Sequence, residues 1–397
     1  MQTHNQAIKE VQRPTQEQKE TQRPIKEQIL KGPMSIDELI KDAQHSMSIC
    51  NSCRYCEGFC AVFPAMEKRL DFTEGDIHYL ANLCHNCSEC YYACQYAPPH
   101  EFAVNIPQQL AQVRNATYQT YAWPKPIARG FEKSGLMLTL WFILALAVLF
   151  GLATLAPSTN AVAQAGDFYS IFPHNTLVTV FGLSALWVVI ALYMGFKNFV
   201  GAVGETPGDL LKGTNLKSAL SDALSMKYLH GNIKTGCTYP DDNISPWRRR
   251  FHHLTFYGFM LCFAATTAGT IMHYLFSLPA PYDFISPPKL LGTIGGISLM
   301  IGTAGQFYLK RKSDPNIRDN LLMGMDYAFI VQLFLAALTG LLLMILRETE
   351  ALKFLLIVHL AVILSLFITM PFGKFVHGFY RLGALMKYAK EEKNTHH

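Results

Sequence analysis

The chain has 397 residues, of which 50% are hydrophobic and only 16% are charged, with a formal net charge of +5. A typical soluble domain carries about 25% charged residues, so this composition argues against a wholly water-soluble protein. The abundance of apolar residues excludes a collagen-like or wholly disordered chain, and a small net charge spread along the chain argues against a nucleic-acid partner.

Residues 1–33 form a polar tract that is punctuated by Pro14 and Pro24 and contains a loose duplication. The tract has no periodic apolar pattern and could not bury enough surface to order itself, so it is predicted to be a disordered tail. No apolar stretch follows Met1, so the tract does not have the pattern of a secretory signal.

Eight of the ten cysteines form two runs with the same spacing, C-x2-C-x2-C-x3-C. The first run is Cys50, Cys53, Cys56 and Cys60, and the second is Cys84, Cys87, Cys90 and Cys94. Such runs ligate [4Fe–4S] clusters, and in two-cluster ferredoxins the fourth cysteine of each run serves the other cluster. One cluster is therefore predicted on Cys50, Cys53, Cys56 and Cys94, and a second on Cys84, Cys87, Cys90 and Cys60.

Zinc and disulfides are the alternatives for these cysteines. Zinc prefers separated cysteine pairs, and disulfides need an oxidising compartment, so both fit less well. Ala61 and Gln95 stand where small bacterial ferredoxins carry proline, and the segment between the runs has a helical pattern. An α-helical ferredoxin, similar to the cluster domain of succinate dehydrogenase iron–sulfur subunits, is expected over 34–115, followed by a linker over 116–134.

Six segments after the linker are apolar enough, and near enough to the required length of about 20 residues, to span a bilayer. They cover 135–156, 177–200, 254–276, 290–309, 325–346 and 352–370. The expected fold is all-α, with a membrane domain over 135–381 that includes a cytoplasmic loop at 201–250, and a cytoplasmic tail at 382–397.

The charge of the loops predicts the orientation of the spans. The 157–176 loop has no Lys or Arg and the 277–289 loop has one, whereas residues 197–253 carry eight. Both ends of the chain and the cysteine domain are therefore expected on the cytoplasmic side of a bacterial inner membrane. Thiols stay reduced in that compartment and are available to bind iron.

Several histidines lie in or beside the third and sixth predicted spans, and ionisable groups at membrane depth are candidates for function. Imidazoles from antiparallel helices can hold haem iron inside a helical bundle. His174, at the outer end of the second span, is expected to be a loop residue. The candidate haem ligands are His252, His253, His273, His359 and His377.

The spacing of these histidines predicts two levels in the membrane. His359 and His377 are 18 residues apart, which returns to the same face of a helix. Because the third span runs outward and the sixth inward, His252 or His253 is expected level with His377, and His273 level with His359. Two haem b groups, stacked across the membrane, are therefore predicted. A single haem, or histidines that merely lie at the interface, are the alternatives.

The chain contains no GxGxxG, Walker or nucleophile-elbow motif, so no flavin or nucleotide site is predicted and no site for an organic substrate is visible. Clusters joined to a haem-bearing bundle make an electron conduit, whose donor is expected to be a separate soluble flavoprotein and whose acceptor is expected to be a membrane quinone. Spacing alone assigns no chemistry to Cys237.

Three further segments carry a family resemblance. Residues 236–241 (GCTYPD), 249–253 (RRFHH) and 257–266, together with the paired cysteine runs, resemble tricarballylate-utilization protein B, also called citrate-utilization protein B. The resemblance runs from about Ser35 to about Lys387. It implies a protein that reoxidises the reduced FAD of a soluble tricarballylate dehydrogenase and passes the electrons to the respiratory chain through two [4Fe–4S] clusters and haem b.

Other functions stay open at this stage. A related fused protein of cobalamin synthesis carries a similar module, so the chain could serve a different flavoprotein, such as a cobalamin-pathway oxygenase. A transmembrane reductase for an external acceptor is another alternative, although the outer loops lack a metal-binding cluster. A redox sensor is a third, although no output domain is visible.

Overall fold

The computed structural model describes residues 35–130, 135–155, 168–231, 236–278, 280–320 and 323–395. Within these ranges the chain is helical, and its extended pairing is limited to an isolated bridge between Cys237 and Ser245. The predicted all-α fold is thereby confirmed. The expected tail at 1–33 lies outside the described residues.

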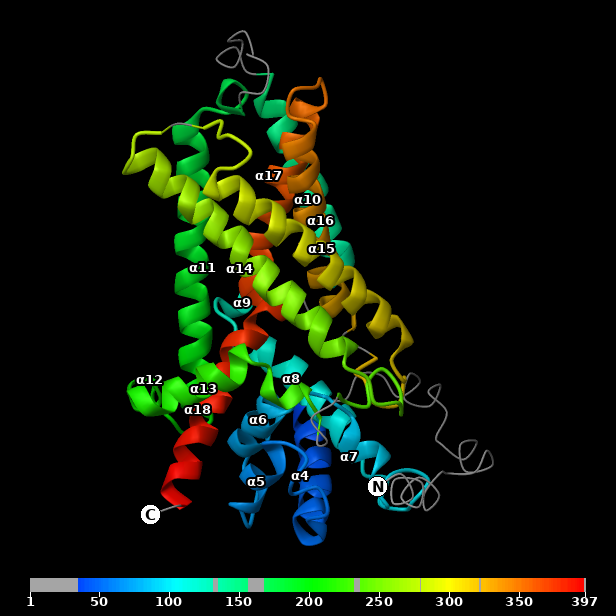
Figure 1. Ribbon diagram of the computed structural model, residues 1–397. Helices are drawn as coiled ribbons and strands as arrows, with labels where there is room; N and C mark the ends of the chain where they lie inside the picture. The colour runs from blue at the N-terminus through cyan, green and yellow to red at the C-terminus, as the bar shows by residue number, and fades with distance from the viewer. Residues whose placement is uncertain are drawn as a thin grey trace.

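The N-terminal domain packs short helices around a buried apolar core (Figure 1). Its helices are α4 (Ile36–Cys53), α5 (Val62–Glu67), α6 (Glu74–Leu83), α7 (Glu89–Tyr92), α8 (Ile106–Thr120) and α9 (Lys125–Gly130). Reciprocal side-chain caps begin two of them, Ser35 with Glu38 on α4 and Thr73 with Asp76 on α6. Because α4 and α6 end at Cys53 and beside Cys84, the helix ends fix where the cysteine runs lie. Helix α8 continues past 115, the expected end of this domain, and α9 lies in the expected linker.

Six long apolar helices stand on this domain, and their length and composition suit bilayer crossing. They are α10 (Gly135–Ala153), α11 (His174–Ala202), α14 (Trp247–Tyr274), α15 (Pro287–Lys312), α16 (Met323–Ile345) and α17 (Leu352–Thr369). Only 11% of the most apolar window of α10, α11 and α14 is buried, which leaves apolar side chains facing outward. The prediction of a multi-pass membrane protein is confirmed.

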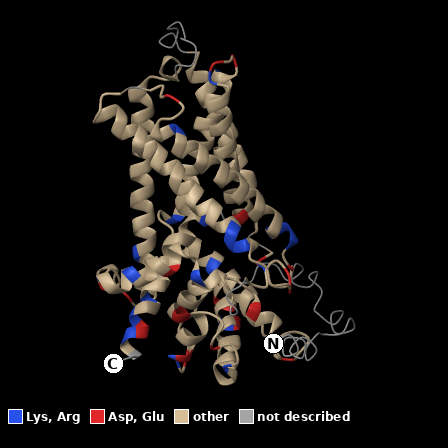
Figure 2. Ribbon diagram, viewed as in Figure 1, with Lys and Arg blue, Asp and Glu red and all other residues tan. Residues whose placement is uncertain are grey.

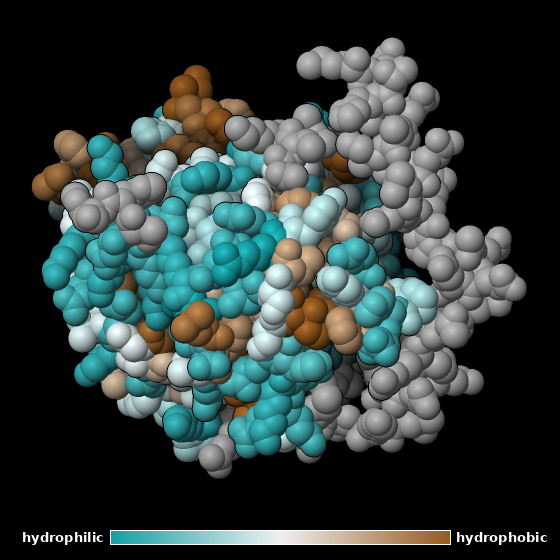
Figure 3. Space-filling model, turned by 90° about the horizontal axis from the view of Figure 1, so that it is seen from below, coloured by the Kyte–Doolittle hydropathy of each residue, from teal (hydrophilic) through white to brown (hydrophobic). Residues whose placement is uncertain are grey.

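Charged residues gather at one end of the molecule. Figure 2 shows Lys, Arg, Asp and Glu around the N-terminal domain and α18 (His377–Thr395), while the middle of the long helices is almost bare. Seen from that end, the surface is largely hydrophilic, with hydrophobic side chains along one edge and in small patches near its centre (Figure 3). This distribution matches one water-exposed domain at one end of an apolar bundle.

Helices α14 and α15 pack against each other through glycine. A Cβ on Gly258 would lie 2.6 Å from the backbone nitrogen of Leu299, and a Cβ on Gly302 would lie 2.5 Å from that of Thr255. Small residues let the backbones of membrane helices approach closely, which supplies the packing contacts that replace hydrophobic burial in lipid. The short elements between the long helices are α12 (Pro207–Leu210), α13 (Gly213–Leu224), η2 (Phe168–Ser170) and η3 (Lys227–Leu229).

Two helix boundaries differ from the sequence-based expectation. Helix α14 begins at Trp247, several residues earlier than predicted, so His252 lies inside its second turn. The sixth span ends near Phe372, because Pro371 and Gly373 interrupt it with the 3-10 turns η4 (Met370–Phe372) and η5 (Lys374–Val376). His377 therefore begins α18 and does not belong to the sixth span, so the same-face argument that linked it to His359 was wrong.

Helix α18 ties the two parts of the molecule together. Glu391 on α18 pairs with Arg69 at 2.5 Å and accepts a hydrogen bond from Tyr79 at 3.1 Å. Lys390 pairs with Glu205, which follows α11, at 2.7 Å. The segment 382–397, expected to be a tail, is thus a packed helix as far as Thr395.

A largely buried ion triad, in which 13–20% of each side chain is exposed, lies where the bundle meets the N-terminal domain. Asp326, in the first turn of α16, forms ion pairs with Lys310 and, at 2.8 Å, with Lys374. Lys374 also donates to Asn115 of α8 at 3.0 Å. Asp326 is the shared partner of both lysines, so its removal would leave two positive charges without a carboxylate.

Asp326→Asn is therefore expected to destabilise the protein by about 3–5 kcal/mol, the usual cost of breaking a buried ion pair. The loss would appear as a lower midpoint in thermal unfolding of the detergent-solubilised protein. Asp71→Asn, at an exposed position, serves as the control with an unchanged midpoint. Equal midpoints for both variants would show that the triad contributes nothing.

Candidate metal centres

The first predicted set of thiols surrounds a cavity of about 100 Å³. Its lining includes Cys50, Cys53 and Cys56 from the end of α4 and the loop after it, together with Cys94, which follows α7. Burial, together with the neighbouring thiols of Cys94, Cys56 and Cys53, raises the pKa of Cys50 to about 12. Three cysteines of one run thus lie beside the fourth cysteine of the other.

The second set lies deeper in the domain, and it too combines three cysteines of one run with the fourth cysteine of the other. Burial raises the pKa of Cys60, and its next largest influences are Cys87 and Cys84. Burial likewise raises the pKa of Cys90, and the neighbouring thiols of Cys87, Cys60 and Cys84 raise it as well. The fourth cysteine of the first run therefore lies among the first three cysteines of the second.

The chemistry of these donors fits iron–sulfur clusters. Each set offers four sulfur donors, the ligands that such clusters use. The raised pKa values of Cys50, Cys60 and Cys90 mean that iron binding at these thiols must displace protons. Within the described ranges, no three His, Cys, Asp or Glu side chains stand in a ready-made metal-binding arrangement. The grouping of the thiols supports the predicted ligand sets without fixing a cluster geometry.

The segment around Cys237 covers the second set. Cys237 is fully buried and belongs to an apolar cluster that includes Cys87 and Tyr239. Thr238 donates a hydrogen bond from Oγ1 to the carbonyl of Cys87 at 3.3 Å. Residues 236–241 thus lie against the second cysteine run, a placement that the spacing of the cysteines could not reveal because the two segments lie about 150 positions apart.

Among the histidines, His252 and His377 face each other. Their ring centres are 6.2 Å apart and their planes meet at 36°. Two imidazoles on one metal ion each need a metal–nitrogen bond of about 2.0 Å, and the two ring radii add to that separation. The distance is therefore compatible with a shared iron. His253 lies beside Tyr257, with ring centres 5.8 Å apart, which favours His252 for the place that the sequence left open between them.

Hydrogen bonds orient both rings. The Nδ1 of His377 donates to the carbonyl of Lys374, which leaves Nε2 as the nitrogen for a metal. The Nδ1 of His252 lies 3.3 Å from the side-chain amide nitrogen of Gln306. If Nε2 of His252 binds a metal, Nδ1 carries the proton, and rotation of the Gln306 amide supplies the oxygen that accepts it.

The second expected pair is not brought together. His273 lies with its ring centre 4.4 Å from that of His174, and Tyr274 Oη is 3.0 Å from His174 Nε2. The Nδ1 of His359 instead lies 2.9 Å from Thr339 Oγ1. Within the described ranges no ring contact joins His273 to His359. His174, expected to be a loop residue, is the first residue of α11 and the ring neighbour of His273.

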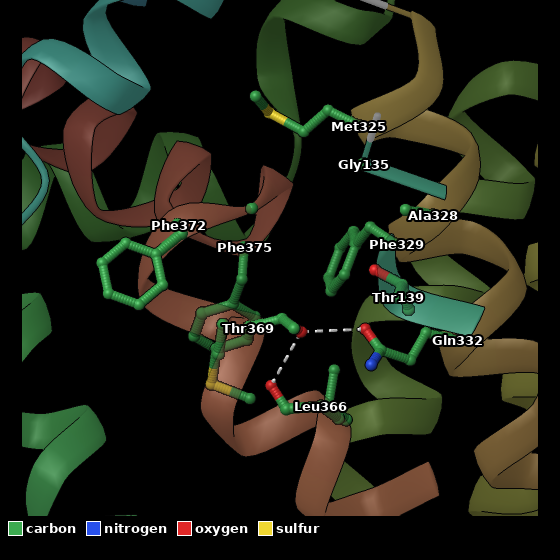
Figure 4. A pocket seen from close by; sticks show the side chains of 12 residues that line it. Gly135, Thr139, Met325, Ala328, Phe329, Gln332, Leu366, Thr369, Phe372 and Phe375 are labelled. Carbon is green, nitrogen blue, oxygen red and sulfur yellow. Dashed lines mark hydrogen bonds between the residues drawn. The ribbon is translucent and has the colours of Figure 1, made fainter. Parts of the chain in front are cut away.

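A small cavity of about 20 Å³ lies between α10, α16 and α17 (Figure 4). Thr369 Oγ1 lies within hydrogen-bond distance of Gln332 Oε1 at 3.2 Å and of the carbonyl of Leu366 at 3.4 Å, as the dashed lines in Figure 4 show. This volume suits about one water molecule, so the cavity is too small for a quinone ring.

The fold and the two sets of cysteines define the class of protein. It is a multi-pass membrane protein whose helical N-terminal domain brings together two sets of four thiols. The chain belongs to the citrate utilization protein B family. The family model described as "Citrate utilization protein B" matches residues 129–397, and the one described as "Citrate utilization protein B Fer4-like domain" matches 43–120.

A curated relative supports the same assignment. "Citrate utilization protein B" of Escherichia coli is 46% identical over 356 residues, which cover 89% of this chain and 92% of that protein. No solved structure matches this chain. The resemblance inferred from the sequence is confirmed, and the Fer4-like domain coincides with the helices that carry the cysteine runs.

Proposed function

We propose that this protein is a membrane electron carrier. It takes electrons from the reduced FAD of a soluble flavoprotein dehydrogenase of the tricarballylate dehydrogenase type and delivers them to the quinone pool. The route runs through two [4Fe–4S] clusters and haem b. The observation that carries the proposal is the order of the candidate sites from the water-exposed end toward the bundle.

The first set of thiols lies nearest the surface. The cavity that it lines includes Tyr55, whose side chain is 67% exposed, so a flavoprotein could approach this site. The second set is more buried, and Arg381 of α18 donates to the carbonyl of its first member, Cys84, at 2.8 Å. Arg381 lies one helical turn from His377, which supports the histidine pair as the next site along the proposed route.

The cofactors would supply the redox chemistry, and the chain would supply their positions. Reduced FAD gives up two electrons and two protons, and a quinone takes up two of each, whereas clusters and haem transfer electrons singly. The thiols of the two sets would hold the clusters, and Nε2 of His252 and of His377 would hold the haem iron. The orientation that the loop charges predict would put the N-terminal domain in the bacterial cytoplasm, where a soluble flavoprotein could reach it.

The test uses the full-length protein purified in detergent. Dithionite-reduced minus oxidised visible spectra should show a b-type haem together with iron–sulfur bleaching. Mixing with tricarballylate dehydrogenase and its substrate, without dithionite, should produce the same difference spectrum, and a soluble quinone should reverse it. A haem that stays oxidised in the presence of the reduced flavoprotein would overturn the proposal.

A further inference from the structure

Three arginines from three helices converge on the loop that carries the start of the second cysteine run. Arg114 of α8 donates to the carbonyl of Cys84 at 3.0 Å, and Arg381 of α18 donates to the same carbonyl at 2.8 Å. Arg248 of α14 donates to the carbonyls of His85 and Asn86 at 2.7 and 2.6 Å. These three side chains are called the arginine cluster below.

The arginine cluster also adjoins the histidine pair. Arg248 precedes His252 by one helical turn on α14, and Arg381 follows His377 by one turn on α18. Residues four positions apart lie on the same face of a helix. Each helix thus presents one histidine and one arginine on the same face, and the two arginines donate to the loop of the second set.

The charge of the arginine cluster exceeds what this packing requires. Neutral donors could satisfy the carbonyls at the end of α6, yet three guanidinium groups are used. Among the ion pairs that the described residues form, none joins a carboxylate to Arg114, Arg248 or Arg381. Burial lowers the pKa of Arg381 to about 10, and repulsion from Arg114 and Arg248 contributes. The buried carboxylate of Glu89 lies in the second cysteine run, but none of the ion pairs between described residues joins it to the three arginines. Three positive charges against one carboxylate favour a further anionic neighbour.

An iron–sulfur cluster in the second set would be that neighbour. Four thiolates outweigh the charge of the iron–sulfide core, so the cluster is anionic, and reduction adds one more negative charge. Positive charge nearby stabilises the reduced form, and local charge and hydrogen bonds set the potentials of such clusters. The first run also carries an arginine, Arg54, but its side chain is exposed and donates to the carbonyl of Asn51 at 3.1 Å.

We propose that the arginine cluster raises the reduction potential of the second cluster above that of the first and so makes the second cluster the electron exit toward His252 and His377. This inference rests on the proposed function. In the step concerned, one electron leaves the first cluster and enters the second, and no proton moves because the guanidinium groups stay protonated. The arginines are positioning residues, since they act on the cluster through its loop and through their charge.

The test compares Arg381→Gln with Arg381→Lys in the full-length protein purified in detergent. Redox titration followed by electron paramagnetic resonance measures the potentials of both clusters, with iron and haem content determined for each sample. Arg381→Gln removes the charge, and we expect the equilibrium constant for transfer from the first to the second cluster to fall at least tenfold, which is about 59 mV for one electron. Arg381→Lys keeps the charge and should change this constant much less.

Arg250→Gln is the matched control, because Arg250 is exposed two positions from Arg248. It should leave both potentials unchanged. If Arg381→Gln loses iron, Arg248→Gln replaces it in the same measurement. Unchanged potentials in a fully loaded Arg381→Gln variant, or an equal shift of both clusters, would overturn the inference. Absence of clusters from the unsubstituted protein would instead overturn the proposed function.

Discussion

Cys94→Ser is expected to remove the cluster of the first set and to leave the cluster of the second. Iron content should fall from about eight to about four atoms per chain, because each [4Fe–4S] cluster holds four. The reason lies in the exchange between the runs: Cys94 is a principal electrostatic neighbour of Cys50 and of Cys56, whereas Cys84, Cys87 and Cys90 would keep Cys60 as their fourth ligand.

The reciprocal variant makes this prediction specific. Cys60→Ser should remove the second cluster and leave the first, so the two variants should show different electron paramagnetic resonance spectra with the same iron content. Cys262→Ser, in the membrane helix α14, is the control and should keep about eight iron atoms. If Cys94→Ser instead spares the cluster that Cys50, Cys53 and Cys56 bind, each run serves its own cluster and the exchange is refuted.

The cysteine grouping and the six spans could be predicted because they depend on local spacing. Cysteines with only two or three residues between them must lie close together, and a run of about 20 apolar residues is itself the signal for a membrane helix. Contacts between residues that are far apart in the sequence became visible only in the structure. The tertiary fold brings Cys237 to the second cysteine run and Arg381 to Cys84. No periodicity in the sequence indicates either contact.

The histidines show where such reasoning fails. The same-face argument assumed one straight helix through His359 and His377, but Pro371 and Gly373 end that helix between them. The pairing of His252 with His377 was nevertheless anticipated, because the direction of each span fixes which end of the bundle it reaches. His174 was assigned to a loop because the second span was expected to begin at residue 177, whereas α11 begins at His174 itself. Helix boundaries are the feature that sequence patterns predict least well.

His377→Ala and His252→Ala are each expected to remove one haem per chain, measured as pyridine haemochrome, while iron–sulfur content stays unchanged. Each variant deletes one of the two imidazoles that would hold the haem iron, and the centres of these two rings are 6.2 Å apart. Quinone reduction by the flavoprotein should stop in both variants, because electrons would reach the second cluster and have no carrier beyond it. Reduction of the clusters themselves should persist.

His253→Ala is the matched control, since His253 is the sequence neighbour of His252 but lies beside Tyr257. It should retain full haem content. Gln306→Leu tests the hydrogen bond behind His252, and loss of such a partner typically weakens metal binding by about 10–100-fold. Haem lost from His253→Ala but retained in His252→Ala would reverse the assignment. Haem retained in both His252→Ala and His377→Ala would move the site away from this pair and toward His174, His273 or His359.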